Sequence, residues 1–162
     1  MSMYKKILVP VDGSHTSTRG LQEAVRLAKD QQAKVRLMHV VDELSVMQGV
    51  DVMGGGAGDI LDLLEESGKK ALRNAKALTD RNGVKAEVVM YRNLSGRVAD
   101  FIVKEARKWR ADLIVMGTHG RRGISHALLG SDAEAAVRLS GVPVMLVRGA
   151  LSAQRKRITK RK

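Results

Sequence analysis

Five short apolar runs alternate along this chain with longer stretches of helical periodicity. The runs are KILVPV at 6–11, VRLMHVV at 35–41, AEVVMY at 86–91, LIVM at 113–116 and VPVMLV at 142–147. Runs of this length and composition suit buried strands. Strands that are separated by helices require right-handed crossovers and therefore parallel pairing. The pattern predicts an α/β fold: a single, doubly wound, five-stranded parallel sheet of Rossmann-like type, with helices on both faces.

The expected helices carry apolar residues at helical spacing. Their stripes comprise Leu21, Ala24, Val25 and Ala28; Leu61, Leu64, Ala71, Leu72, Ala75 and Leu78; and Val98, Phe101, Ile102 and Ala106. Asn82-Gly83 is a stop signal for the second of these helices, and Ser95 is a candidate cap for the third. A fourth helix is expected over 131–139. Glycines at 54–56 and 58 predict a loop over 42–58.

Composition excludes several classes of function. The 162-residue chain has no cysteine, which removes disulfides, thiolate nucleophiles and cysteine–zinc sites. One Trp, one Phe and two Tyr are too few for aromatic platforms that stack nucleic-acid bases. No apolar run approaches the roughly 20 residues that span a membrane, and the N-terminus lacks a secretion signal. We expect one domain and a cytoplasmic location.

The net charge of +12 is concentrated at the C-terminus. The segment 149–162 holds six basic residues and no acidic one, which is half of the excess. We therefore divide the chain into a domain over 1–148 and a basic tail over 149–162 that we expect to be disordered. Such a tail is usually only solvated, yet it can add salt-sensitive affinity for nucleic acid or an anionic membrane surface.

A glycine-rich loop follows the fourth predicted strand, in the place where doubly wound sheets bind ligands. Gly117 and Gly120 let the backbone turn sharply and approach a ligand, and Gly130-Ser131 begins the next helix, whose free amides favour an anion. The loop contains neither a Walker sequence nor a G-x-G-x-x-G fingerprint. From these residues alone, a phosphate cradle and an ordinary loop are equally good interpretations.

Four blocks of sequence, in order, resemble the universal stress protein family. They are KKILVPVDGS, LMHVVDE, ADLIVMGTHGRRGISHALLGS and VPVMLVR. The third contains the spacing G-x2-G-x9-G-[ST], which is similar to the ATP-binding signature of that family. The resemblance implies an adenine-nucleotide α-hydrolase-like fold that binds ATP, or AMP or ADP, with Mg²⁺ accompanying ATP.

The resemblance also implies roles for individual residues. Asp12 matches an acidic residue on the ribose or adenine side, although a turn or capping role is its competing interpretation. The other matching positions are Pro10 and Val40 beside the adenine, Met116 and Gly117 at the base and ribose edge, and Gly120, Arg121, Gly130 and Ser131 around the phosphates. His119 is interpreted as loop scaffold and His39 as a packed strand residue. No metal site is expected, because no two histidines have zinc-ligand spacing.

Two features complicate the phosphate end of this site. Ser131-Asp132-Ala133-Glu134 has the capping-box pattern S-x-x-E, so Ser131 is also a candidate helix cap. Asp132 departs from the small apolar residue that is usual there in the family. A carboxylate in the first helical turn suits the helix dipole but repels a nearby phosphate. Triphosphate binding is therefore less secure than binding of the base and ribose.

The resemblance implies a regulatory, nucleotide-binding stress-response module rather than an enzyme, with a homodimer formed through the last strand. A weak ATPase or phosphotransferase is one alternative, but phosphoryl transfer needs metal ligands, a positioned base and cationic clamps. Asp12 and Arg121 are the only candidates for such roles. A second alternative is an interaction protein that uses the basic tail. The process served and the protein partner are not readable from the sequence.

Overall fold

The computed structural model describes residues 3–50, 57–119 and 129–149, which form a five-stranded parallel sheet and its covering helices. The strands are β1 (Lys6–Pro10), β2 (Lys34–Asp42), β3 (Ala86–Asn93), β4 (Leu113–Gly117) and β5 (Val144–Val147). The helices are α1 (His15–Gln31), α2 (Glu43–Val50), α3 (Ala57–Arg81), α4 (Val98–Trp109) and α5 (Ser131–Leu139). The predicted fold class is confirmed, and the five predicted strands are all present.

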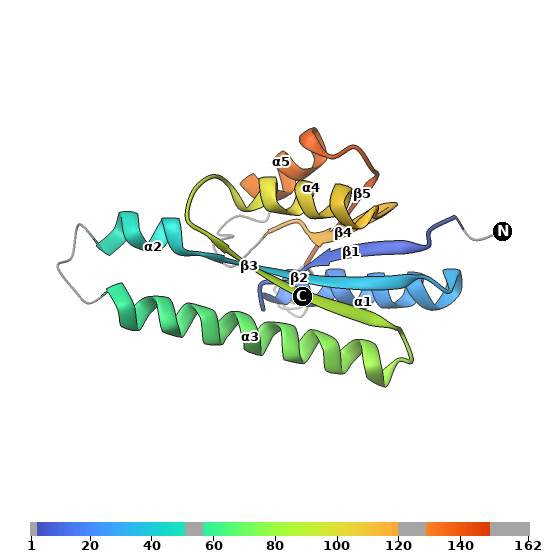
Figure 1. The fold of residues 1–162 in the computed structure, drawn as a ribbon. Helices are drawn as coiled ribbons and strands as arrows, with labels where there is room; N and C mark the ends of the chain where they lie inside the picture. The colour runs from blue at the N-terminus through green and yellow to red at the C-terminus, as the bar shows by residue number, and fades with distance from the viewer. Residues whose placement is uncertain (1–2, 51–56, 120–128, 150–162) are drawn as a thin grey trace, which may run out of the picture.

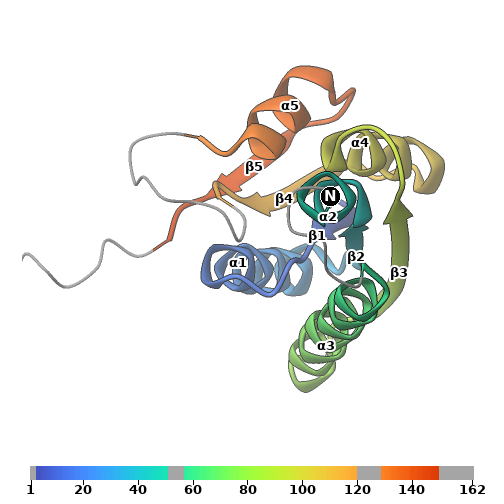
Figure 2. The same ribbon diagram turned by 90° about the vertical axis from the view of Figure 1, so that its left-hand side faces the viewer.

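The helices lie in two layers, with α1 and α3 on one face of the sheet and α4 and α5 on the other (Figure 1). Figure 2 shows the same layers along the strands. Each face has its own apolar core: Val9 and Leu21 pack on the α1 and α3 side, and Leu8 and Ile102 pack on the α4 side. Leu8 and Val9 are neighbours in β1 and enter different cores, because successive side chains of a strand point to opposite faces of the sheet.

The order of the strands indicates where on the sheet a ligand site is expected. The order is β3-β2-β1-β4-β5, so the direction in which strands are added reverses between β1 and β4. All five residues of β4 are buried, as expected of a strand between two others. In open α/β sheets the crevice beyond the carboxyl ends of the strands, at this reversal, is the usual ligand site.

The predicted loop over 42–58 is wrong in part, because Glu43–Val50 forms helix α2. Residues 51–56 of that prediction lie outside the described residues. The helix is held by a contact that no local pattern reveals: the carboxylate of Glu43, only 3% exposed, pairs with the guanidinium of Arg92 at the end of β3. A side chain 49 residues away therefore contributes to the stability of this helix.

The predicted cap at Ser95 is also wrong. Strand β3 continues to Asn93, and α4 begins only at Val98, with Arg97 as its N-cap residue. The carboxylate of Asp100 accepts a hydrogen bond from the Arg97 amide at 3.2 Å and another from its guanidinium at 3.0 Å. These hydrogen bonds hold the pKa of Asp100 below its ordinary value. The N-terminus of α4 is thus capped by Asp100, a residue of its own first turn.

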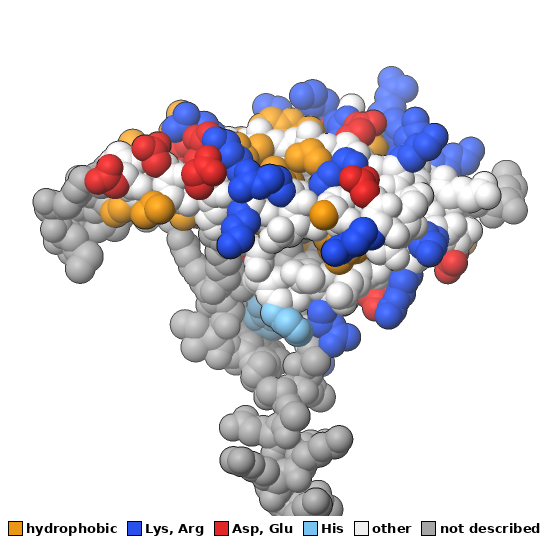
Figure 3. Space-filling view, turned by 90° about the horizontal axis from the view of Figure 1, so that it is seen from below, with side chains coloured by type: hydrophobic (Ala, Val, Ile, Leu, Met, Phe, Trp, Pro, Cys, Tyr) orange, Lys and Arg blue, Asp and Glu red, His pale blue; other side chains and the backbone are white. Residues whose placement is uncertain are grey.

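Helix α3 has acidic residues in its first half and, apart from Asp80, basic residues after them. Asp59, Asp62, Glu65 and Glu66 lie in its first half, and Lys69, Lys70, Arg73 and Lys76 follow. Figure 3 shows acidic side chains gathered at the end of the molecule where α3 begins. Acidic residues at the start of a helix and basic ones later complement the helix dipole. The arrangement stabilises a 25-residue helix that projects beyond the sheet.

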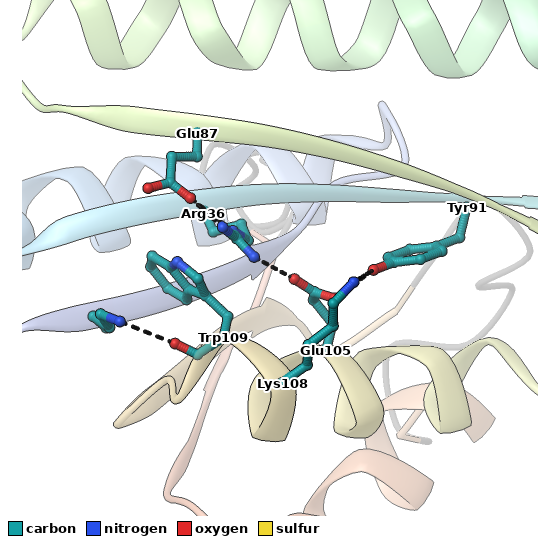
Figure 4. Close-up of polar contacts among 7 residues, drawn as sticks. Arg36, Glu87, Tyr91, Glu105, Lys108 and Trp109 are labelled. Carbon is teal, nitrogen blue, oxygen red and sulfur yellow. Dashed lines mark hydrogen bonds and ion pairs between the residues drawn. The ribbon is translucent and has the colours of Figure 1, made fainter.

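A polar network around the buried carboxylate of Glu105 joins α4 to β2 and β3 (Figure 4). The guanidinium of Arg36 lies between two carboxylates, with Nη1 at 2.6 Å from Glu105 and Nε at 3.0 Å from Glu87. The indole of Trp109 lies 4.7 Å from that guanidinium, as in a cation–π contact. The hydroxyl of Tyr91 donates to Glu105, and this hydrogen bond raises the pKa of Tyr91.

Candidate functional site

A pocket of about 480 Å³ opens beyond the carboxyl ends of β1, β2 and β4. Seven of the predicted site residues line it: Pro10, Asp12, Val40, Met116, Gly117, Gly130 and Ser131. They come from segments more than 100 residues apart in the chain, which the parallel sheet brings to one edge. The predicted site residues Gly120 and Arg121 lie outside the described residues.

The backbone of β2 offers hydrogen-bonding groups to this pocket. Pairing of β2 with β1 ends at Pro10–Met38, and the carbonyl of Met38 accepts from the Val11 amide at 2.7 Å. Strand β2 nevertheless continues to Asp42. Backbone groups of alternate residues point to the same side of a strand. The amide and the carbonyl of Val40 therefore point to the same side of β2 as the carbonyl of Met38. They are therefore directed toward the space beyond the end of β1.

Asp12 lies in the turn between β1 and α1 and also lines the pocket. Its carboxylate lines the pocket, and its Oδ1 accepts a hydrogen bond from the Ser14 amide at 2.8 Å. The cap of α1 is Ser14, whose hydroxyl accepts from the Ser17 amide at 3.1 Å. Asp12 therefore shapes the turn before α1 while facing the pocket. The turn holds the carboxylate in a defined position.

The predicted capping box at Ser131 is wrong. Gly130 is the N-cap residue of α5, and its carbonyl accepts from the Glu134 amide at 2.9 Å. Ser131 is the first helical residue and is exposed at the pocket. Gly130 is also held to β4, because its amide donates to the Thr118 carbonyl at 2.9 Å. The start of α5 is thus fixed at the pocket edge, where its first amides and the helix dipole favour an anion.

Asp132 caps a different helix from its own. Its Oδ1 accepts a hydrogen bond from the Ala99 amide in the first turn of α4, at 3.3 Å. Helices α4 and α5 therefore begin side by side, and one carboxylate lies between their positive ends. Asp132 also lines the pocket. The sequence indicated a carboxylate near the phosphate end, but not that α4 holds it.

Gly117 lines the pocket and is also required for the packing of α1 on β4. A Cβ at this position would lie 2.8 Å from the carbonyl carbon of Thr16 in α1, which is too close for any side chain. The hydroxyl of Thr16 donates to the carbonyl of His119, which ties the end of β4 to the start of α1. A side chain at position 117 is thus excluded because the backbone of α1 lies against this residue.

His39 and Asp42 belong to the pocket although neither was predicted as a site residue. His39 is 5% exposed, and its Nδ1 lies 2.7 Å from the Val11 carbonyl, so this nitrogen carries the proton. It is a packed strand residue, as predicted, and also lines the pocket. Asp42 accepts from Nδ2 of Asn93 at 3.0 Å. Ligands of doubly wound sheets bind beyond the carboxyl ends of the strands, which is why Asp12 was predicted. Because Asp42 ends β2, the same rule would have predicted Asp42.

Metal sites and membrane-spanning helices were sought among the described residues. The described residues contain no group of three His, Asp or Glu side chains arranged to hold a metal ion. Among the described helices, none combines the length and hydropathy that a bilayer crossing requires. The pocket at the strand ends is the candidate site because it lies at the reversal of strand order.

The fold and the pocket define a doubly wound α/β protein of the adenine-nucleotide α-hydrolase-like type, with its candidate ligand site at the reversal of strand order. The sequence profile of the Universal stress protein family matches residues 3–148, and the chain belongs to this family. The predicted family is confirmed.

Individual relatives agree with this assignment. Universal stress protein MJ0531 of Methanocaldococcus jannaschii is 38% identical over 148 residues, covering 91% of this chain and 84% of that protein. The solved structure of MJ0577 from the same organism has a TM-score of 0.75 at 30% identity, covering 90% of this chain and 96% of the other. A universal stress protein crystallised in complex with cAMP has a TM-score of 0.65 at 25% identity, covering 92% and 100%.

Proposed function

We propose that this protein is an adenine-nucleotide-binding regulatory module of the stress response. The observation that carries the proposal is the convergence of Asp12, the free edge of β2 at Val40 and the start of α5 on one pocket. The complex of a related universal stress protein with cAMP supports an adenine nucleotide as the ligand class.

In the proposed complex, the adenine lies against the apolar wall formed by Pro10, Val40 and Met116. The backbone groups of Val40 supply hydrogen bonds to the base, which are specific because a buried donor or acceptor left unmatched is costly. The carboxylate of Asp12 accepts from the ribose hydroxyls. Phosphate lies at the first amides of α5, beside Gly130 and Ser131. ATP, ADP and AMP all satisfy this arrangement, with Mg²⁺ accompanying ATP.

The proposal is binding without turnover, in the cytoplasm. Phosphoryl transfer relies on cationic clamps and a base positioned at the reacting phosphate. The described residues that line the pocket include no Lys and no Arg. We propose that a bound nucleotide acts as a signal, read by a protein partner.

We also propose a homodimer formed through β5. This strand lies at the edge of the sheet, so one side of its backbone has no neighbouring strand among the described residues. Met145 on β5 is 39% exposed and Val137 on α5 is 49% exposed. An apolar edge strand of this kind is a surface that pairing with a second copy would cover.

The test is to identify what the purified protein carries. Denaturation followed by chromatography is expected to release an adenine nucleotide, and calorimetry on the stripped protein should show it rebinding. Asp12→Ala is expected to weaken binding at least about tenfold, through the lost ribose contact. Asp30→Ala, at an exposed position of α1, is the matched control and should bind normally.

An empty pocket together with an affinity of millimolar or weaker for every adenine compound would overturn the proposal. Magnesium-dependent release of ADP from ATP, abolished by Asp12→Ala, would instead establish turnover. Retention on DNA or anionic vesicles that is lost in salt and on removal of residues 149–162 would favour the tail-dependent alternative.

A further inference from the structure

The solvent-facing side of the first half of α3 combines apolar and acidic side chains. Four exposed residues have the spacing i, i+3, i+4, i+7, which places them on one face of the helix: Asp59, Asp62, Leu63 and Glu66. Leu63 is 71% exposed, and Ile60, one turn before it, is 40% exposed. Figure 3 shows hydrophobic side chains beside the acidic ones at this end of the molecule. Large apolar side chains that lie together in solvent are typical of a contact surface.

The described residues offset the charge of this face only in part. Of its three carboxylates, that of Glu66 pairs with Lys69 of the next turn at 2.9 Å. Asp62 lies in the field of Arg92, but the guanidinium of Arg92 pairs with Glu43. The face therefore keeps a net negative charge around its apolar side chains. A partner of matching chemistry is basic and carries an apolar side chain of its own.

The C-terminal end of the chain has this chemistry. The sequence RKRITKRK at 155–162 places three basic residues on each side of Ile158 and contains no acidic residue. On α3 the order is reversed in sign, because acidic residues lie on both sides of Leu63. The two segments therefore match in charge and in the position of an apolar side chain among the charges. The segment 150–162 lies outside the described residues.

The last described residue lies near enough to α3 for the segment to reach it. A Cβ on Gly149 would lie 2.9 Å from Cγ2 of Thr16, so the chain leaves the domain beside the first turn of α1. Helices α1 and α3 cover the same face of the sheet and both begin at the carboxyl ends of the strands (Figure 1). Residues 150–162 can span up to about 43 Å when extended. That is several times the roughly 10 Å that separates the axes of packed helices.

We propose that the exposed face of α3 around Leu63 binds the basic C-terminal segment 150–162 of the same chain. This contact goes beyond the nucleotide-binding function, since Asp59, Asp62, Leu63 and Glu66 do not line the pocket. Each exposed ion pair contributes little. The tether compensates, because it holds the segment at an effective concentration of about a millimolar. The bound segment has its charges engaged, so it is withheld from nucleic acid or an anionic membrane surface.

The experiment uses the full chain, whose lack of cysteine allows one thiol to be placed at will. Thr159→Cys introduces a nitroxide spin label between the basic residues without changing their charge. The unpaired electron broadens the amide signals of nearby residues in ¹⁵N spectra, with the reduced label as reference. We expect the strongest broadening at residues 59–66 of α3. Added salt should weaken it, because salt screens exposed charges.

Two variants in the labelled chain test the face itself. Asp59→Asn combined with Asp62→Asn should reduce the broadening of α3 at least about twofold, through the lost ion pairs. Leu63→Ser should reduce it as well, and its exposed position keeps the fold intact. The matched control is Asp30→Asn combined with Asp80→Asn, which removes the same charge from exposed residues in the last turns of α1 and α3. The control should leave the broadening unchanged.

Several results would overturn the proposal. They are an absence of broadening, broadening spread evenly over the surface, broadening centred on another element, and equal effects of the acidic double variant and its control. A mixed sample tests whether the contact forms within one chain: spin-labelled chain without ¹⁵N is added to ¹⁵N-labelled chain without the spin label. Broadening of α3 in that sample as strong as in the doubly labelled chain would assign the contact to a second copy and reject the proposal.

Discussion

The carboxylate of Glu105, 1% exposed, lies 2.6 Å from Nη1 of Arg36, and this pair joins α4 to β2. Glu105 belongs to the helix whose first turn lies beside the pocket, while Arg36 belongs to the strand that supplies Val40 and Asp42 to it. The pair therefore fixes two elements of the candidate site relative to each other. The contribution of this pair to the free energy of unfolding can be measured.

Glu105→Ala is expected to lower the free energy of unfolding by about 2 kcal/mol, because it removes a charge-assisted hydrogen bond from Arg36, which keeps its contact with Glu87. It also leaves the Tyr91 hydroxyl without this acceptor. Glu23→Ala is the control: it breaks the exposed pair of Glu23 with Arg26 and should cost less than about 1 kcal/mol. Urea unfolding measures both. Equal losses in the two variants would mean that the buried pair contributes no more than a surface pair.

The hydrogen bond from Tyr91 to Glu105 raises the pKa of Tyr91 above its ordinary value of 10.0. A raised pKa favours the protonated form in the folded state. The stabilisation is therefore complete below about pH 10 and is lost as the pH rises through the folded-state pKa. Absorbance at 295 nm should show a tyrosine ionising late, in a step that Tyr91→Phe removes. Persistence of that step in Tyr91→Phe, or its loss in Tyr4→Phe, would contradict the prediction.

The hydrogen bonds from Arg97 to Asp100 predict an effect in acid. Because they lower the pKa of Asp100 from its ordinary value of 3.8, their stabilisation is present above that pH and is lost as the pH falls through the folded-state pKa. Asp100→Asn should therefore be less stable than the wild type at pH 6, with the gap closing below pH 4. Chemical unfolding across this range measures the gap. A gap that does not depend on pH would assign the effect to something other than the charge.

Gly68 and Gly58 offer a matched pair within α3. A Cβ on Gly68 would lie 2.5 Å from Cδ2 of His39, whereas a Cβ on Gly58 would meet nothing within 4 Å. Gly68→Ala should therefore displace the imidazole, weaken its hydrogen bond to Val11 and cost about 1–3 kcal/mol. Gly58→Ala should be neutral or slightly stabilising, because alanine favours helix. Calorimetric melting of the two variants tests this, and a neutral Gly68→Ala would show that the ring moves without cost.

The wrong predictions concern helix ends and one short helix. Ser95 and Ser131 both have the chemistry of a cap, but the N-cap residues of α4 and α5 are Arg97 and Gly130. Helix α2 lies in a segment whose nearby glycines suggested a loop, and the ion pair of Glu43 with Arg92 holds its start. Signals of this kind fail when a contact with a distant segment outweighs the local preference.

The sequence by itself determined the alternation of five strands with helices, the family and the edge of the sheet where the candidate site lies. The alternation and the position of the site depend on apolar periodicity and turn residues, which act between near neighbours in the chain, whereas the family was indicated by four blocks of residues in order. Only the tertiary structure decided how the site is held. Asp132 caps α4 from 33 residues away, and Arg36 pairs with Glu105 across 69 residues. No local pattern encodes such contacts, because the crossovers of the parallel sheet create them when the chain folds.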